Sequence, residues 1–462
     1  MGRSGTGRGL GAALLASSLL PLNSTMIAVA LPEIAREFGH SPGTAAQAVV
    51  ASYLVAAIVL QSPGGKLGDR LGHWRMLALG QVLTACGAVL GMFAGTLAVL
   101  AVARVMMAAG GAATVPATVA LLRIELPEER RGRAFGTFGA VMSLAAGIGP
   151  LVGGELVRAF GWPSIFAVNL PVIGVAALLA ATARPGGRPE PRARSRFDVL
   201  GTALLTAALT AFVLGLESGG TAGAVLLGAC VVLLVPFVWW ERRVADPVVA
   251  FALFTSAPFT AGTLLVALQN LVMYTLLFEL PQVLGAVLAV DAAAVGRLLV
   301  SMMGAMIVAS LLAGRVVDRI GPRPVAVAGT IACLGAVALL ASDDLASPGR
   351  LALPLALLGV GVGLATPAAQ SASLAAVPGA RSGAAAGIAS TMRYLGGVVG
   401  VALLGRLVHL EGDRAAVLGE HRTVLAVFAA ALVAGLACAL ALPRRSAARN
   451  AAPDDTIRDV RS

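Results

Sequence analysis

The sequence has few charged residues, few aromatic residues and only four cysteines. Charged residues make up 12% of its 462 residues and aromatic residues 5%, whereas a typical soluble domain is about a quarter charged. So little charge excludes an ordinary water-soluble surface. The cysteines, Cys86, Cys230, Cys333 and Cys438, lie singly within apolar runs, which excludes a disulfide framework and a cysteine-rich metal site. We expect them to be small buried apolar side chains.

Motifs for catalysis and for nucleotide hydrolysis are also missing. The four histidines, His40, His73, His409 and His421, are expected in separate loops, and no Ser/His/Asp, HExxH or P-loop pattern occurs. Without a nucleophile and base, or a binding loop for ATP, the chain is predicted to be neither an enzyme nor an ATP-driven pump. No catalytic residue, cofactor or metal site is expected.

Apolar residues make up 58% of the chain, and the mean hydropathy is +0.88. Uncharged runs of about 18 residues or more are long enough to cross a bilayer as helices. The sequence therefore predicts an all-α integral membrane protein with fourteen transmembrane helices. The expected spans are 10–30, 42–65, two between Met76 and Leu122 joined by a hairpin at Ala94 to Thr96, 134–154, 159–183, 199–216, 218–240, 255–278, 293–313, 324–342, 351–375, 383–405 and 423–443.

The formal net charge of +11 follows a topological pattern. Most Lys and Arg fall in the N-terminus, the C-terminal tail and the loops of one side, for example Arg130, Arg131, Arg188, Arg444 and Arg445. The positive-inside bias places this side in the cytoplasm, so both termini are expected there, with the chain in the cell membrane. The basic residues are spread over short loops and form no single face, which excludes a nucleic-acid partner.

A charged, glycine-rich stretch occurs twice in register. Gly65 to Gly72 reads GKLGDRLG, and Gly314 to Gly321 reads GRVVDRIG, so the pattern GxxxDRxG recurs at an offset of 249 residues. The repeat predicts two related halves, each with this stretch as a turn after its second span. The offset of 249 residues is longer than six spans with their connections would require, and the surplus is about the length of one helical hairpin. We expect a six-helix bundle over 1–183, a basic linker with an inserted helix pair over 184–246, a second bundle over 247–443 and a tail over 444–462.

With these features the chain resembles a known family. Both copies of the repeat resemble the signature loop of the major facilitator superfamily, and the fourteen spans resemble its drug:proton antiporter branch. Further stretches resemble motifs of that branch: Arg104 to Gly110, Ala146 to Gly154, Trp162 to Pro171, Arg196 to Gly201, Asp246 to Pro247 and Arg381 to Leu404.

The repeated stretch is interpreted as a conformational latch formed by Gly65, Gly68, Asp69, Arg70, Gly72, Asp318 and Arg319. Its glycines allow close backbone approach, and Asp69 can accept hydrogen bonds from amides at a helix N-terminus or from an arginine such as Arg130 or Arg131. Such a latch would hold two helix ends together in one state of the protein. The alternative is an ordinary solvated loop.

The fifth helix carries Gly149, Pro150, Gly153 and Gly154. Small residues spaced by four allow another helix to approach to backbone contact, and proline allows a bend. The resemblance implies that this antiporter motif keeps the exchange path free of leaks, while static packing is the alternative. Glycines at 383, 387, 396 and 400 repeat the device in the thirteenth helix.

Energy coupling is where the chain departs from the resembled pattern. The first helix has Asn23 where the family carries an acid, and a neutral amide cannot carry a proton. The resemblance implies a role in proton transfer for Arg104, with bonding to helix carbonyls as the alternative. Among the acids near spans, Glu155, Glu217 and Glu279, we expect Glu279 to be the substitute proton carrier. Its alternative role is an acid at the water-exposed outer rim.

The expected substrate cavity is polar and, apart from Arg393, uncharged. Its predicted lining is Asn23, Thr25, Tyr53, Gln61, Met142, Gln269, Asn270, Gln370 and Arg393. Flexible thioethers and aromatic faces suit varied amphipathic ligands, although such residues also face lipid or pack between helices.

Together these features predict a secondary active transporter that exports lipophilic organic compounds, such as drugs, antibiotics or secondary metabolites, by alternating access. Its expected partners are the small-molecule substrate, protons and the lipid bilayer, and its expected oligomeric state is a monomer. The alternatives are a facilitator or importer of a small organic solute and a membrane sensor with a transporter fold.

Overall fold

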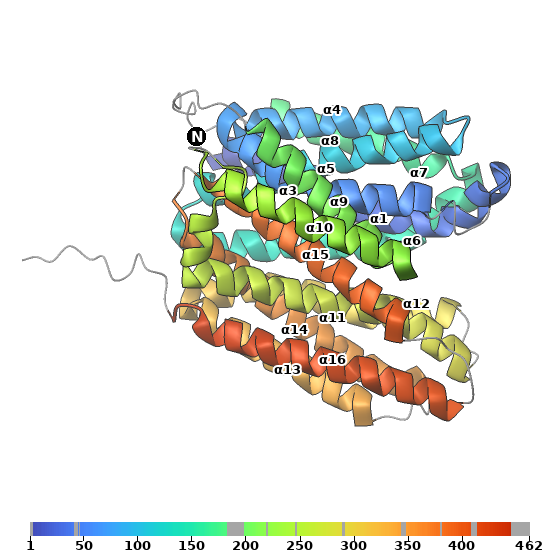
Figure 1. The fold of residues 1–462 in the computed structure, drawn as a ribbon. Helices are drawn as coiled ribbons and strands as arrows, with labels where there is room; N and C mark the ends of the chain where they lie inside the picture. The colour runs from blue at the N-terminus through green and yellow to red at the C-terminus, as the bar shows by residue number, and fades with distance from the viewer. Residues whose placement is uncertain are drawn as a thin grey trace, which may run out of the picture.

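The computed structural model describes residues 3–444 apart from 41–44, 46, 183–197, 219, 245–246, 289–291, 343–347, 379–380 and 408–413. Within these residues the chain is helical, with no strand, as predicted. Helix α1 begins and helix α16 ends at the same end of the molecule (Figure 1). We call this the termini end and the other the far end.

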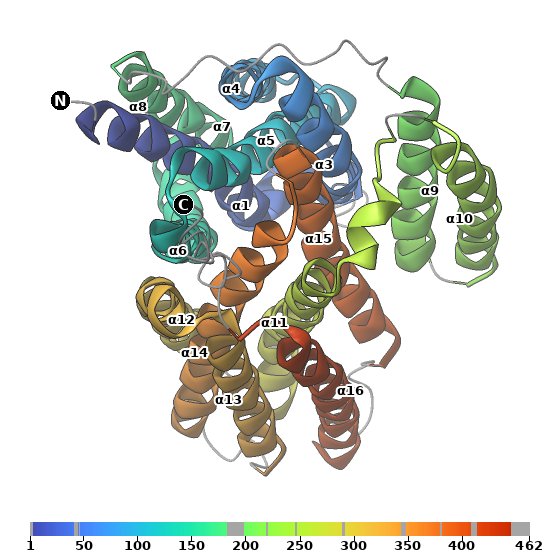
Figure 2. The same ribbon diagram turned by 90° about the vertical axis from the view of Figure 1, so that its left-hand side faces the viewer.

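The first half of the chain supplies the helices of one group (Figure 2). They are α1 (Arg3–Glu37), α3 (Ser52–Leu71, preceded by a π-helical turn, Gln47–Ala51), α4 (His73–Met92), α5 (Leu97–Glu125), α6 (Glu128–Phe160), α7 (Ser164–Ala167) and α8 (Asn169–Ala181). Their inward faces bury apolar side chains such as Leu100, Phe138 and Phe166 in one cluster. Such burial between helices positions the polar groups described below.

The second half supplies the other group (Figure 2). Its helices are α11 (Ala257–Leu288, preceded by a 3-10 turn, Phe251–Thr255), α12 (Ala292–Ile320), α13 (Pro322–Ser342), α14 (Pro348–Ala375), α15 (Ser382–Leu407) and α16 (Arg414–Ala441). Leu276, Leu355 and Phe428 belong to its apolar core.

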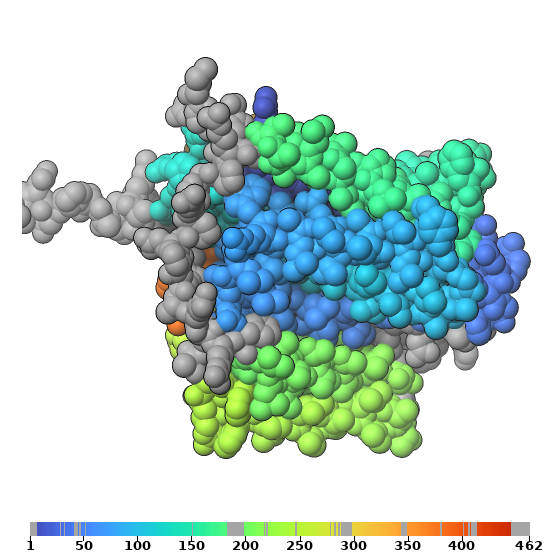
Figure 3. Space-filling model, turned by 90° about the horizontal axis from the view of Figure 1, so that it is seen from above, coloured from blue at the N-terminus to red at the C-terminus, as the bar shows by residue number. Residues whose placement is uncertain are grey.

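Helices α9 (Val199–Ser218) and α10 (Gly220–Glu241) lie outside both groups, beside α3 (Figure 2), and form a separate layer along one edge of the surface in Figure 3. Their ends at the termini end are tied together, since Trp240 Nε1 donates to Asp198 Oδ1 at 2.8 Å. The Glu241 carboxylate accepts from the backbone N–H groups of Val248 and Val249. These bonds fix the hairpin to the segment that leads into α11.

Thirteen of the described helices are long and apolar enough to cross a membrane, and the count is fourteen when the two segments of α6 are one span. Those segments, Glu128–Gly149 and Leu151–Phe160, meet at 41° beside Pro150, as expected for a proline that removes a helix hydrogen bond. The fold class is therefore the predicted one.

Two local predictions were wrong. The repeated stretch is no turn: α3 continues to Leu71 and α12 to Ile320, and the chain reverses only at Gly72 (φ 94°) and Gly321 (φ 88°), in a backbone conformation that glycine tolerates. Cys86 is exposed instead of buried, because the outer face of α4 needs no packing partner from the protein.

Candidate functional site

Asp69 joins α3 of the first helix group to α15 of the second. Its two carboxylate oxygens accept hydrogen bonds from the backbone N–H groups of Gly383 and Ala384, each at 2.8 Å. These residues open α15, where backbone N–H groups lack partners within the helix and a negative charge is favoured. Of the two partners expected for Asp69, the structure therefore selects helix-end amides. His73 Nε2 also lies 3.5 Å from Asp69 Oδ1.

Asp318, in the second copy of the repeat, makes the equivalent contact in the opposite direction. Its oxygens accept from the backbone N–H groups of Gly132 at 2.9 Å and Arg133 at 3.1 Å, near the start of α6. The two aspartates thus bind the starts of α15 and α6 from α3 and α12, so the repeat is a repeat in space as well. Arg319 is exposed and Arg70 is half-buried.

Arg123, at the end of α5, adds a third contact between the groups. Its guanidinium donates to the carbonyl oxygens of Val377 and Pro378 and, at 2.7 Å, to the Ser382 hydroxyl. All three acceptors lie at the junction of α14 and α15. A single arginine at the end of an apolar helix carries no distinctive pattern, and the sequence analysis did not assign it a role.

Glycines let the same helices approach to backbone contact at the termini end. A Cβ atom on Gly65 would lie 2.1 Å from the carbonyl oxygen of Gly383, and one on Gly387 would lie 2.5 Å from that of Gln61. On the other side, a Cβ on Gly314 would lie 2.5 Å from the carbonyl oxygen of Gly132. Backbone contact of this kind leaves no path between α3 and α15 or between α6 and α12.

The glycine motif of α6 packs against α1. A Cβ on Gly149 would lie 1.9 Å from Thr25 Oγ1, and one on Gly153 would lie 3.0 Å from Val29 Cγ2, whereas Gly154 has nothing within 4 Å. Two of the motif's three glycines therefore serve close approach of helices. Thr25 and Met142 were expected in the cavity, but Thr25 packs at this contact and Met142 is buried in the core of the first group.

Asn23 is paired with another amide. Its Nδ2 lies 2.7 Å from Asn169 Oδ1, and Asn169 Nδ2 lies 3.0 Å from Asn23 Oδ1. Both side chains are buried. The position of the missing acid is thus occupied by a neutral pair between α1 and α8.

Arg104 is buried beside this pair. Its Nε donates to the Val49 carbonyl oxygen at 3.0 Å and its Nη1 to the Asn23 carbonyl oxygen at 3.1 Å, while its Cζ lies 3.9 Å from the ring centroid of Tyr53. The Nη2 atom has no hydrogen-bond partner. No carboxylate is among the groups that act on Arg104 in the described part of the chain.

Arg393 lies on α15 of the second group. It lies within electrostatic range of Tyr274 and Tyr394, and its Nε has no hydrogen-bond partner. Tyr394 is in turn within electrostatic range of Tyr53. The three tyrosines of the chain therefore lie within electrostatic range of Arg104 or Arg393, although they are far apart in sequence.

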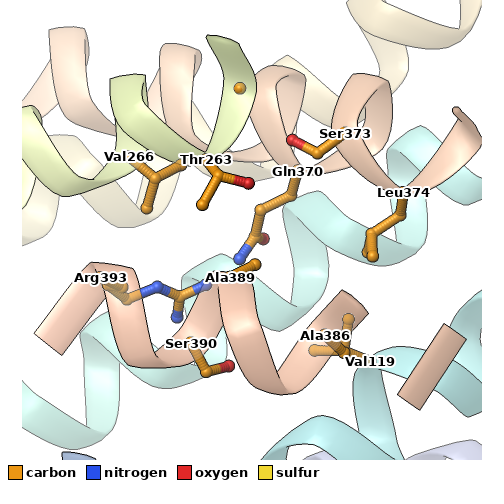
Figure 4. Close-up of a pocket in the computed structure, with 11 residues that line it drawn as sticks. Val119, Thr263, Val266, Gln370, Ser373, Leu374, Ala386, Ala389, Ser390 and Arg393 are labelled. Carbon is orange, nitrogen blue, oxygen red and sulfur yellow. The ribbon is translucent and has the colours of Figure 1, made fainter. Parts of the chain in front are cut away.

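A cavity opens beside Arg393 between the two helix groups (Figure 4). Val119 of α5 lines it from the first group, and Thr263, Gln370 and Ser390 contribute polar side chains from α11, α14 and α15. Gln370 Oε1 and Thr263 Oγ1 are buried without a partner. Of the predicted cavity residues, Gln370 and Arg393 line this space.

The other predicted amides are also buried, Gln269 and Asn270 on α11 and Gln61 on α3. Gln269 Oε1 accepts from the Thr366 hydroxyl at 3.3 Å, and Asn270 Nδ2 donates to the Val266 carbonyl oxygen at 2.8 Å. Gln61 is buried with neither its Nε2 nor its Oε1 atom bonded. No group of three or more metal-ligating side chains occurs among the described residues.

Glu279 pairs with a histidine that the sequence analysis placed in a loop. Its Oε1 lies 2.6 Å from His421 Nδ1, between α11 and α16, and both side chains are buried. The expected loop for His421 and the alternative of a water-exposed rim for Glu279 were both wrong, because α16 begins at Arg414 and α11 continues to Leu288. The charged residues closest to His421 in the sequence of α16 are Arg414, Glu420 and Arg422. The side chain of Glu217 is outside the described residues, and Glu155 is exposed and bonded to Arg158.

Comparison with known proteins gives one consistent result. A sequence model described as Major Facilitator Superfamily matches residues 13–268 and 262–460. An uncharacterized MFS-type transporter of Bacillus subtilis, YvkA, is 31% identical over 91% of this chain and 92% of its own. The tetracenomycin C resistance and export protein of Streptomyces glaucescens is 31% identical over 84% of this chain and 73% of its own.

Among solved structures, the proton:xylose symporter XylE superposes with a TM-score of 0.69 over 95% of both chains, at 15% sequence identity. At that identity the likeness concerns the fold alone.

Proposed function

The chain belongs to the Major Facilitator Superfamily and is a membrane transporter, not an enzyme, and from that premise we propose that it exports lipophilic organic compounds from the cell by alternating access, in exchange for protons. Relatives that resemble it over most of its length include an antibiotic export protein. The proposed units are the two bundles, 1–183 and 247–443, which move against each other, and the inserted segment 184–246. The protein is proposed to act as a monomer.

The observation that carries the proposal is the pair of aspartate contacts at the termini end. Asp69 and Asp318 each join one bundle to the start of a helix in the other through two charge-assisted hydrogen bonds. Such a contact is discrete: it is made or broken, as a two-state transporter requires. The positive-inside bias assigns the termini end to the cytoplasm, so this state is closed toward the cytoplasm.

For proton coupling we propose Glu279, with His421 as its partner. An acid and an imidazole at 2.6 Å can share a proton within the membrane, whereas the amide pair at Asn23 cannot. Arg104 would hold α5 to α1 and to the turn before α3 in this scheme. The α6 glycines would seal the path along α1.

The proposal is tested by accumulation of a chemically broad set of lipophilic compounds in cells with and without the protein. Lower accumulation in cells that contain the protein supports export. Higher accumulation indicates an importer or facilitator. Equal accumulation of every compound, with the protein shown to be in the membrane, contradicts transport and favours a sensor.

A further inference from the structure

Arg393 lines the cavity between the two bundles, and no aspartate or glutamate in the described part of the chain lines that cavity. The groups that act on its guanidinium among the described residues are the tyrosines Tyr274 and Tyr394. An arginine within a membrane is costly unless a partner or water supports it. Arg104 is supported by two carbonyl oxygens and the Tyr53 ring, but Arg393 has no such bonds.

The wall of the cavity beside Arg393 has a polar part and an apolar part. In Figure 4 the Arg393 guanidinium points toward the cavity, with Gln370 facing it and Ser390 beside it. Buried polar atoms without partners, such as Thr263 Oγ1 and Gln370 Oε1, are rare unless a ligand or water satisfies them. Val119, Val266 and Leu374 supply the apolar part of the wall.

Tyr274 and Tyr394 lie within electrostatic range of the same guanidinium but do not line the cavity. Tyr274 Cδ2 would be 3.0 Å from a Cβ on Gly397, so this ring packs against α15 one turn beyond Arg393. No acid among the described residues lines the cavity, so nothing in its wall neutralises a cationic ligand.

From these contacts we infer that the substrates are organic anions with an apolar body, whose carboxylate or other acidic group binds the Arg393 guanidinium. This inference rests on the proposed export function and adds its substrate class. A planar carboxylate matches the fork of donors on arginine. The Gln370 amide and the hydroxyl groups of Thr263 and Ser390 bind the polar atoms of the ligand that the guanidinium does not contact. The bound anion supplies the negative charge that the cavity wall lacks.

The experiment compares three probes that share one ring and differ in charge. These are 1-naphthoate, the neutral 1-naphthalenemethanol and the cationic 1-naphthylmethylammonium, and binding to the purified full chain in detergent micelles is measured by equilibrium dialysis. We expect 1-naphthoate to bind the wild type at least about ten-fold more tightly than either other probe. A ten-fold ratio of affinities corresponds to the free energy of a hydrogen bond to a charged group. Arg393→Gln should abolish this preference and Arg393→Lys should retain part of it.

Arg158→Gln is the matched control, because Arg158 is an exposed arginine paired with Glu155 on the outer surface of α6. This variant should leave the preference unchanged. Equal binding of the three probes, a preference for the cation, no detectable binding of 1-naphthoate, or a preference that survives Arg393→Gln overturns the inference. If cells still export neutral or cationic compounds in that case, the proposed function stands and only the substrate class is wrong; if no compound is exported, the proposed function itself fails.

Discussion

Glu279 Oε1 lies 2.6 Å from His421 Nδ1 inside the second bundle, and the outer oxygen of the acid and the outer nitrogen of the imidazole have no hydrogen-bond partner. At this distance a hydrogen bond joins the carboxyl group and the imidazole. The pair is separated by 142 residues in sequence and joins α11 to α16. The proton site that we propose here therefore depends on how these two helices pack.

We predict that Glu279→Gln abolishes gradient-driven export while exchange of substrate across the membrane without a gradient continues. The glutamine keeps the shape of the side chain and removes the proton. Driven efflux and counterflow in proteoliposomes measure the two activities separately. The control is Glu155→Gln, which removes an exposed acid and should change neither activity. Gradient-driven export by Glu279→Gln would exclude Glu279 as the carrier.

His421→Gln is predicted to change the pH dependence of driven export without removing counterflow. The substitution removes the imidazole that lies 2.6 Å from the Glu279 carboxylate, so the proposed proton carrier loses the group with which it exchanges its proton. The measurement is initial efflux rate against pH for the variant and the wild type. A purely structural role for His421 predicts lower rates at every pH with an unchanged profile.

Asp69→Asn should leave the protein inserted in the membrane and lower transport strongly. In the wild type, each carboxylate oxygen accepts from one backbone N–H, of Gly383 or of Ala384. Asparagine keeps one of these acceptor oxygens, and its NH₂ group, a donor, replaces the other and faces a backbone N–H. The loss of a charged hydrogen bond costs about 1.5–3 kcal/mol, enough to shift a two-state balance by about ten-fold or more. Export is measured per amount of membrane protein, and Asp318→Asn should behave alike. Unchanged export by either well-expressed variant would contradict the latch.

Gly149→Leu is expected to damage the contact between α1 and α6, while Gly154→Leu is tolerated. A side chain at Gly149 collides with Thr25, and overpacking of this kind costs about 1–3 kcal/mol, whereas the space around Gly154 is open. Melting temperature in detergent micelles measures the packing effect. Proton leak across vesicles, measured without substrate, distinguishes a sealing role of this contact from static packing: a sealing role predicts a faster leak for Gly149→Leu only.

The sequence predicted contacts that obey a repeat or a helical spacing. The double GxxxDRxG pattern predicted that Asp69 and Asp318 act in the same way, and the glycines of the fifth helix predicted close approach. The partner of Asp69 was left open, because Gly383 is 314 residues away and a backbone amide has no sequence signature.

Pairs of unlike residues from distant helices could not be predicted. Nothing in the chain marks His421 as the partner of Glu279, and the helix boundary was set two residues beyond this histidine, where the uncharged run begins. Asn169 was noted within a motif, yet its pairing with Asn23 depends on the packing of α8 against α1. The gathering of Tyr53, Tyr274 and Tyr394 likewise comes from tertiary structure alone.

The central claim is that this chain drives organic compounds out of the cell in exchange for protons. The most direct measurement is uptake of substrate into everted membrane vesicles, with the pH gradient intact and then collapsed by an ionophore. Export predicts uptake that requires the protein, depends on the gradient and is lost in Glu279→Gln. If uptake requires the protein but does not depend on the pH gradient, proton exchange is contradicted. Some compounds accumulate less in cells that contain the protein; if vesicles take up none of these compounds, export is contradicted.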